Sequence, residues 1–387
     1  MSRTIPVCSL ALVLICASSV LASAQVTSST TENNSVQSNA TPVAYVYVSS
    51  FPSGNTGQIN GYSAAPNGAL TAIPGSPFPD NVDYMAVNGS WLFGIENNLN
   101  EGLIDSYAIE SNGALTLKDV FTQSSTYSGL ISVYLDHTGS TLYSDLYTTN
   151  NDYLQYSINQ TTGQLTNIGD LPGGPPNNSP VSFIGNNQYA YSSSCYHFGP
   201  EIIGVQRAAN GTLSYLNNFN PPFPAEKSGG FYCPWLAAAD PTNHLAVAME
   251  PLNSNWGQDG NYQLAVYTAD SSGNLTTNST DSNMPSVLIG TPYDYWMSPN
   301  GKYLAVGGSG GMQIFHFNGA NPITKMTGLL TTNPINQIFW DNSNHVYAIS
   351  QSEGKLFVWS VNSNGVTKAS GSPHAIPGAD HLIVLPK

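Results

Sequence analysis

The chain carries the stretch QINGYSAAPNGALT at residues 58–71. Residues 58–62 alternate apolar and polar side chains, which is typical of a β-strand with one buried face. Asn67 and Gly68 supply the positive φ angle that a tight hairpin turn needs, and residues 69–71 begin a second strand. The stretch therefore predicts a β-hairpin.

This hairpin belongs to a repeat with a period of about 45 to 57 residues. Its turn and short strand return at residues 112–116, 163–166, 210–214, 273–276 and 364–367, and in altered form at residues 319–324. A more uniformly apolar strand precedes each copy, as at residues 91–95, and is expected to lie between neighbouring sheets. An innermost strand comes before that. The unit is thus four antiparallel strands, which is the blade of a β-propeller.

The number of copies predicts an all-β, seven-bladed β-propeller. The first copy lacks an innermost strand, whereas the chain ends on an additional apolar strand at residues 381–385. Docking this strand into blade one joins the two ends of the ring and removes an open edge. A two-sheet sandwich or a parallel solenoid would explain neither the four strands of each period nor the match between the strand missing from the first copy and the additional strand at the C-terminus.

The N-terminus has the pattern of a signal peptide. An apolar run at residues 5–21 ends in the small-x-small pattern ASA at residues 22–24. We expect residues 1–24 to be removed, residues 25–42 to form a disordered Ser/Thr/Asn-rich tether, and residues 43–387 to form the propeller. The mature protein is therefore expected to be secreted or periplasmic, with no membrane attachment.

The composition excludes several kinds of partner. Charged residues make up only 8% of the chain, and acidic residues outnumber basic ones by 23 to 9, giving a net charge of -14. This sign is wrong for a nucleic acid or an anionic membrane surface. Once Arg3 is removed, Arg207 is the only arginine, so a bidentate clamp for a phosphorylated ligand cannot form. We expect a monomer with a small-molecule partner.

Propellers bind ligands at the mouth of the central channel, where loops lead into the innermost strands and away from the second strands. Aligning the innermost strands places one residue of each blade near this mouth. These residues are His381, Tyr84, Ser132, Ser182, Leu236, Asp294 and Gln337. The set is polar but mixed and contains neither a catalytic triad nor a metal-ligand spacing, so we expect no metal and no cofactor.

Four titratable residues near the mouth are candidates for catalysis. Glu250 ends the apolar second strand of blade five, and Asp145 lies in the corresponding strand of blade three. Each is either a desolvated acid with a raised pKa or a solvated or turn-capping carboxylate. His381 is either a base or a structural histidine at a blade junction, and Asp294 either joins the site or caps a turn.

Aromatic side chains are concentrated in two long loops, at residues 218–235 and 250–261, which carry Tyr232, Trp235 and Trp256. Rings over a channel mouth suit a flat ligand such as a sugar, and Tyr84 and Gln337 are placed to contact the same ligand. The alternative is that the loop aromatics only plug the channel and pack among themselves.

Two cysteines remain after signal-peptide removal, Cys195 and Cys233. The blade alignment places both on the mouth face of the neighbouring blades four and five. We expect either a disulfide that clamps these blades in an oxidising compartment or two buried thiols.

Taken together, residues 58–78, 298–306 and 371–373 resemble the repeats of the lactonase-like seven-bladed propellers. That family includes propeller-type 6-phosphogluconolactonase and fungal carboxymuconate cyclase, and the resemblance covers essentially the whole mature chain. Residues 249–252, with Glu250, resemble the family segment that carries an acidic active-site residue, and Asp145 resembles part of its Asp-Leu-Gly-x-Asp element.

The family pattern fails at two places. Its Pro-Arg-His element aligns with residues 234–236, and its His-bearing start of blade three aligns with residues 129–132. The missing arginine and histidines are the groups that would bind an anionic lactone and move its proton. An unmodified phosphogluconolactonase or cyclase activity is therefore not expected.

Two functions remain open from the sequence. In the first, the protein hydrolyses a neutral, sugar-derived or other lactone, with Glu250 as base, Asp145 or Asp294 as polar support, and the loop aromatics as a platform for the ring. In the second, the same face binds a glycan or a protein without catalysis.

Overall fold

The computed structural model describes residues 41–54, 56–96, 102–123, 130–146, 152–173, 180–196, 199–227 and 229–387. The predicted signal peptide and most of the predicted tether lie outside these ranges, so both stay predictions. In the described part of the chain all regular structure is β-strand, and no helix there is long and apolar enough to cross a membrane.

The described strands form seven antiparallel sheets, one for each predicted repeat. Blade 1 contains β30 (Ala379–Pro386), β1 (Ala44–Ser50), β2 (Gln58–Ala64) and β3 (Leu70–Ala72), with β4 (Phe78–Pro79) added to β2. Blade 2 contains β5 (Val82–Val87), β6 (Trp91–Glu96), β7 (Leu103–Ile109) and β8 (Leu115–Thr122). Blade 3 contains β9 (Leu130–Leu135), β10 (Thr141–Leu146), β11 (Asp152–Ile158) and β12 (Leu165–Leu171). Blade 4 contains β13 (Ser182–Phe183), β14 (Tyr189–Tyr196), β15 (Gly199–Arg207) and β16 (Leu213–Tyr215).

The last three blades follow the same order from the innermost strand outward. Blade 5 contains β17 (Phe231–Ala239), β18 (His244–Leu252), β19 (Gln263–Ala269) and β20 (Leu275–Thr276). Blade 6 contains β21 (Pro292–Met297), β22 (Tyr303–Gly308), β23 (Gly311–Asn318) and β24 (Asn321–Lys325). Blade 7 contains β25 (Gln337–Trp340), β26 (His345–Ser350), β27 (Lys355–Asn362) and β28 (Gly365–Lys368), with β29 (His374–Ala375) added to β27.

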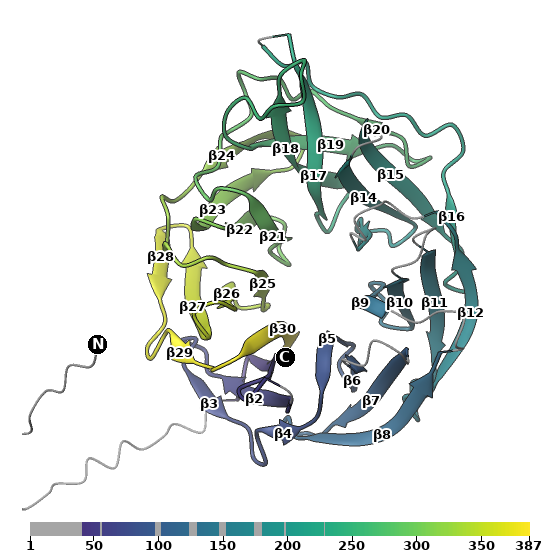
Figure 1. Cartoon of the computed structure of the whole chain (residues 1–387), viewed down its shortest axis with the longest axis vertical. Coiled ribbons are helices and arrows are strands. Elements are labelled where there is room, and N and C mark those ends of the chain that lie inside the picture. Colours follow the sequence, from purple (N-terminus) through teal and green to yellow (C-terminus); the bar gives the residue numbers. More distant parts are fainter. Residues whose placement is uncertain are drawn as a thin grey trace, which may run out of the picture. The chain divides into compact units, whose positions relative to one another are not determined.

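The ring is closed by the C-terminal strand, as the sequence predicts. β30 pairs with β1 from Ala44 opposite Pro386 to Val48 opposite Leu382. Figure 1 shows this strand, in yellow, lying beside the purple first strands of blade 1. Beyond the pairing, Lys387 N donates to Val43 O at 2.9 Å, so the two ends of the propeller are hydrogen-bonded neighbours. The prediction of a seven-bladed propeller closed in this way is confirmed.

The second strand of each blade supplies most of the core. All residues of β1, β22 and β26 are buried, which confirms that these uniformly apolar runs lie between sheets. Their side chains pack against strands of both neighbouring blades, and a fully buried apolar side chain of this size stabilises the fold by roughly 1.5–3 kcal/mol.

The glycine-containing turns of the repeat also connect the blades. The phenol of Tyr47 in blade 1 donates to Gly113 O in blade 2 at 2.7 Å. The phenols of Tyr143 and Tyr191 reach Gly211 O and Gly273 O of their next blades at 2.7 and 2.8 Å. This repeated geometry explains why glycine recurs at the turn, because the preceding blade packs directly against it.

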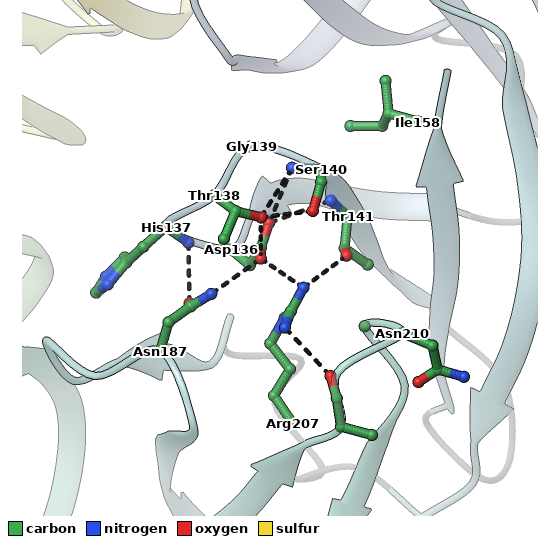
Figure 2. Close-up of polar contacts among 12 residues, drawn as sticks. Asp136, His137, Thr138, Gly139, Ser140, Thr141, Ile158, Asn187, Arg207 and Asn210 are labelled. Atoms are coloured by element: carbon green, nitrogen blue, oxygen red, sulfur yellow. Dashed lines mark hydrogen bonds and ion pairs between the residues drawn. The ribbon is translucent and has the colours of Figure 1, made fainter. Parts of the chain in front are cut away.

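Arg207 lies on the face of the propeller opposite the channel mouth, where each innermost strand turns into the second strand of its blade. Its Nη2 lies 2.8 Å from Asp136 Oδ2, which also accepts a hydrogen bond from Asn187 Nδ2 at 3.0 Å. Asp136 Oδ1 caps the turn by accepting from Thr141 N at 3.1 Å. Figure 2 shows this network joining blades 3 and 4. Arg207 is therefore committed to a buried ion pair, which would cost about 3–5 kcal/mol to break by removing one partner.

Candidate functional site

The mouth of the channel is shaped by β-bulges in the innermost strands. In the described residues, five innermost strands shift register against their second strands near the mouth, in blades 1, 2, 3, 5 and 6. In blade 1 Asp380 and His381 lie together opposite Ser49. In blade 2 Asp83 and Tyr84 likewise lie between two regular β5–β6 pairs, Val82 with Glu96 and Met85 with Gly94. Bulges re-aim side chains and are frequent next to functional sites.

These two equivalent bulges bring a histidine between two carboxylates. His381 Nδ1 lies 2.6 Å from Asp83 Oδ1 and 2.9 Å from Asp380 Oδ2. The His381 side chain is only 8% exposed, and the ring of Tyr84 packs against it with 3.6 Å between centroids. We call Asp83, Asp380 and His381 the blade 1–2 cluster.

The three groups of this cluster shift one another's pKa. Burial lowers the pKa of His381, but the interactions with Asp380 and Asp83 outweigh it and raise the pKa above its ordinary value. Burial raises the pKa of Asp83, and the nearby Asp380 carboxylate adds to this. Burial also disfavours ionised Asp380, yet His381 and Asp83 hold its pKa down at about 2. A negative charge is therefore concentrated on Asp380.

Asp145 lies near the same part of the mouth. Its Oδ2 accepts from Ser132 Oγ at 2.6 Å and its Oδ1 from the phenol of Tyr134 at 3.2 Å. Burial raises the pKa of Asp145 to about 7, although both hydrogen bonds oppose the shift. Burial also raises the pKa of Tyr84 to about 12, and the charges of Asp83, Asp380 and Asp145 reinforce it.

Glu250 lies three blades away around the ring, opposite Cys233 in the β17–β18 ladder. Cys233 and Cys195 form a disulfide that joins blade 5 to β14 of blade 4. Glu250 Oε2 is 3.8 Å from Cys195 Sγ, which carries no hydrogen in the disulfide, so this is a packing contact. Burial raises the pKa of Glu250, and a hydrogen bond from Tyr262 partly offsets the rise.

Trp235 completes this second group. It is the extra residue of the blade 5 bulge, and its indole packs edge-on against Tyr262 with 5.9 Å between centroids. Its Nε1 donates to Pro292 O of blade 6 at 3.1 Å, which fixes the ring. We call Glu250, Tyr262 and Trp235 the blade 5 group: a half-buried carboxylate, the phenol that donates to it, and the indole that packs against that phenol.

The polar side-chain atoms of Asp294 and Gln337 accept hydrogen bonds from the neighbouring blade. Asp294 Oδ2 accepts from Ile338 N of blade 7 at 2.7 Å, and Gln337 Oε1 accepts from Leu382 N of blade 1 at 2.6 Å. Burial raises the pKa of Asp294 to about 7. These side chains act as ties between successive innermost strands.

The two other aromatic candidates differ in exposure. Tyr232 is buried, and its phenol oxygen lies 2.5 Å from Gln263 Oε1 and 2.9 Å from Asp281 Oδ1, the two acceptors available to its one hydrogen. Trp256 is 52% exposed and packs edge-on against Phe231 with 4.7 Å between centroids. Of the two, only Trp256 presents a ring to solvent.

Asp83, Asp380 and Tyr262 were not predicted from the sequence as site residues. A signal was present for the first two, because Asp83-Tyr84 and Asp380-His381 are each an aspartate followed by a ring at the start of an innermost strand. Tyr262 precedes β19 and carries no distinguishing pattern.

The closed ring of seven four-stranded blades, with its bulged mouth, defines the class of this protein as a seven-bladed β-propeller. No protein-family model matches the chain, and no curated protein matches it in sequence. Solved structures do share its fold.

A Bacteroides uniformis protein provisionally assigned as a 6-phosphogluconolactonase matches with a TM-score of 0.68 and 13% identity, over 88% of this chain and 99% of its own. The periplasmic gluconolactonase of Pseudomonas aeruginosa gives 0.65 and 13%, over 88% and 99%. A Bacteroides fragilis protein, also provisionally assigned as a 6-phosphogluconolactonase, gives 0.64 and 14%, over 88% and 98%. The chain thus shares its propeller fold with these three proteins.

Proposed function

We propose that the protein is an exported hydrolase that opens a neutral lactone at the channel mouth. The observation that carries this proposal is the blade 5 group, in which half-buried Glu250 has a raised pKa and accepts a hydrogen bond from Tyr262, whose ring packs against the indole of Trp235. The predicted signal peptide supports export, and the gluconolactonase of the same fold supports a lactone as the substrate class.

The chemistry needs one base and one water molecule. Glu250 takes a proton from water while the water oxygen attacks the lactone carbonyl carbon. The ring C–O bond then breaks, and the proton passes from Glu250 to the departing ring oxygen, giving a hydroxy acid. A raised pKa makes Glu250 a stronger base than an ordinary carboxylate. The indole of Trp235 offers a flat surface for the substrate ring.

The charges favour a neutral substrate. Arg207, the only arginine besides Arg3, is buried in its ion pair with Asp136 on the face of the propeller opposite the mouth. At the mouth stand Asp380, with a pKa of about 2, and Glu250, so the local charge repels a phosphorylated lactone.

The test compares hydrolysis of glucono-δ-lactone and of its 6-phosphate by the mature protein, after subtraction of the spontaneous rate. We expect turnover of the neutral compound, a much slower reaction of the phosphate, and a loss in kcat of about 10²–10⁴-fold in Glu250→Gln. The matched control is Glu353→Gln, which removes an exposed carboxylate paired with Lys355 and should leave the rate unchanged. The proposal fails if no lactone is turned over or if Glu250→Gln keeps the wild-type rate. In that case a non-catalytic binding propeller becomes the better interpretation.

A further inference from the structure

The blade 1–2 cluster contains more acceptors than its hydrogens can satisfy. His381 Nδ1 carries at most one hydrogen, which is directed at Asp380 Oδ2, 2.9 Å away. Asp83 Oδ1 is buried and lies even closer to the same nitrogen, at 2.6 Å, so this one hydrogen cannot be donated fully to both carboxylates. Two carboxylates and an imidazole therefore converge on one point that a single proton does not neutralise.

We propose that Asp83, Asp380 and His381 bind a divalent transition-metal cation, with Zn²⁺ as the best match and Mn²⁺ as the next. One ligand atom of each residue lies within 4.8 Å of the other two. Tetrahedral metal–ligand bonds of about 2.0–2.2 Å place adjacent ligand atoms about 3.3–3.6 Å apart. Asp83 Oδ1 and Asp380 Oδ2 lie 2.6 and 2.9 Å from His381 Nδ1, so each pair would have to separate by at most about 1 Å to admit the ion. Two carboxylates cancel the charge of the ion, and an imidazole favours zinc over magnesium or calcium.

The ligands are already oriented by neighbours that would not touch the ion. Ser49 Oγ accepts from His381 N at 3.1 Å and donates to Asp83 O at 3.1 Å, so it holds both halves of the cluster. Gln351 Nε2 donates to Asp380 O at 2.6 Å and to Asp380 Oδ1 at 3.2 Å. Such outer partners are typical of metal sites, where they fix the ligands before the ion binds.

The position of the site predicts what the ion would do. Its ligands come from β30 and β5, so a bound ion links the strand that closes the ring to the next blade. Three protein ligands also leave a coordination position for water or a substrate oxygen at the mouth. This proposal does not depend on lactone hydrolysis by Glu250, because binding is measured without a substrate.

The test is titration of the chelator-treated mature protein with ZnCl₂ by calorimetry, with thermal unfolding followed in parallel. We expect saturable binding of one equivalent, a rise in Tm, and much weaker binding of Mg²⁺. Asp83→Asn and Asp380→Asn should abolish the saturable phase, Gln351→Ala should weaken it about 10-fold, and Glu353→Gln should leave it unchanged.

The wild-type isotherm and Gln351→Ala keep the test decisive if a ligand variant does not fold. The proposal is wrong if wild-type protein shows no saturable one-to-one phase, or if folded Asp83→Asn binds zinc as tightly as wild type. Several weak equivalents that persist in every variant would mean adventitious binding and would equally overturn it. Lactone turnover measured on the same samples distinguishes this result from a failure of the proposed hydrolysis.

Discussion

Asp145 illustrates how burial alone can give a carboxyl group unusual properties. Its partners, Ser132 and Tyr134, are neutral hydroxyl groups, so no cation compensates for the cost of ionisation. The pKa of Asp145 therefore rises from 3.8 to about 7. Because the pKa is higher in the folded than in the unfolded state, protonated Asp145 adds stability below about pH 4, and this contribution is lost as the pH rises toward 7.

Asp145→Asn should remove this pH dependence, because an amide of the same shape never ionises. Relative to wild type, we expect the free energy of unfolding of the variant to increase from pH 4 to pH 8, by at most about 4 kcal/mol. Urea unfolding at the two pH values measures the change. Asp270→Asn is a control that should change little between these two pH values, since backbone hydrogen bonds from Asn274 and Ser272 lower the pKa of exposed Asp270 and its contribution is lost only below about pH 4. A stability difference between Asp145→Asn and wild type that is the same at both pH values would contradict the assignment.

At the scale of the element, the hairpin turn of the repeat does two things. Gly113 has a φ of +87°, and a Cβ there would come within 2.8 Å of Ile73 and 2.9 Å of Tyr45 in the preceding blade. Glycine is therefore needed both for the turn and for contact between blades. The sequence motif showed the first requirement but not the second.

Comparing Gly113→Ala with Gly89→Ala separates these two requirements. Gly89 has a similar φ of +97°, but nothing lies within 4 Å of the position that a Cβ would occupy there. We expect Gly89→Ala to lose about 1–2 kcal/mol of stability from backbone strain alone. Gly113→Ala should lose about 1–3 kcal/mol more because blade 1 must move. Equal losses in chemical unfolding would show that the contact between blades is unimportant.

The innermost strands show that an alignment of the repeats does not reveal the register in which each strand pairs with its neighbour. Aligning them on prolines and turns placed Tyr84 and His381 at equivalent positions, and the structure puts both in equivalent bulges. The same alignment placed Asp294 at the equivalent position in blade 6. In the structure, however, the Asp294 carboxylate accepts a hydrogen bond from blade 7. A bulge depends on how a strand pairs with its neighbour, so the alternation of side chains along one strand does not reveal it.

At the scale of the whole molecule, stability depends on closing the ring. β30 is the innermost strand of blade 1, and without it β1 would present an open edge. The two ends of the propeller are already joined by the hydrogen bond from Lys387 N to Val43 O.

Removing residues 378–387 should therefore prevent a stable monomer, whereas a new covalent connection between the ends should be tolerated. The matched variant is a circular permutant in which a short Gly-Ser linker joins residue 387 to residue 42 and new ends are opened between Ser363 and Asn364, in an exposed turn. We expect the permutant to elute as a monomer with a near-native Tm, and the truncated protein to aggregate. A truncated protein that unfolds cooperatively at the wild-type Tm would contradict this account.

Patterns along the chain were enough to specify the number of blades, the strand order in each and the closing strand. These features follow from local chemistry: the alternation of residues 58–62, the Asn-Gly turns, and the unpartnered apolar strand at residues 381–385. The same patterns nominated Glu250, His381 and the two remaining cysteines by their places in the repeat.

Which of these residues meet could be learned only from the folded ring. Asp83 and Asp380 come from nearly opposite ends of the chain and converge on His381 because the ring closes there and both strands bulge. Likewise, Tyr262 reaches Glu250 and Cys195 reaches Cys233 through pairing across strands and blades. Local patterns specify strands and turns, whereas contacts between distant residues depend on register and packing, which no single segment encodes.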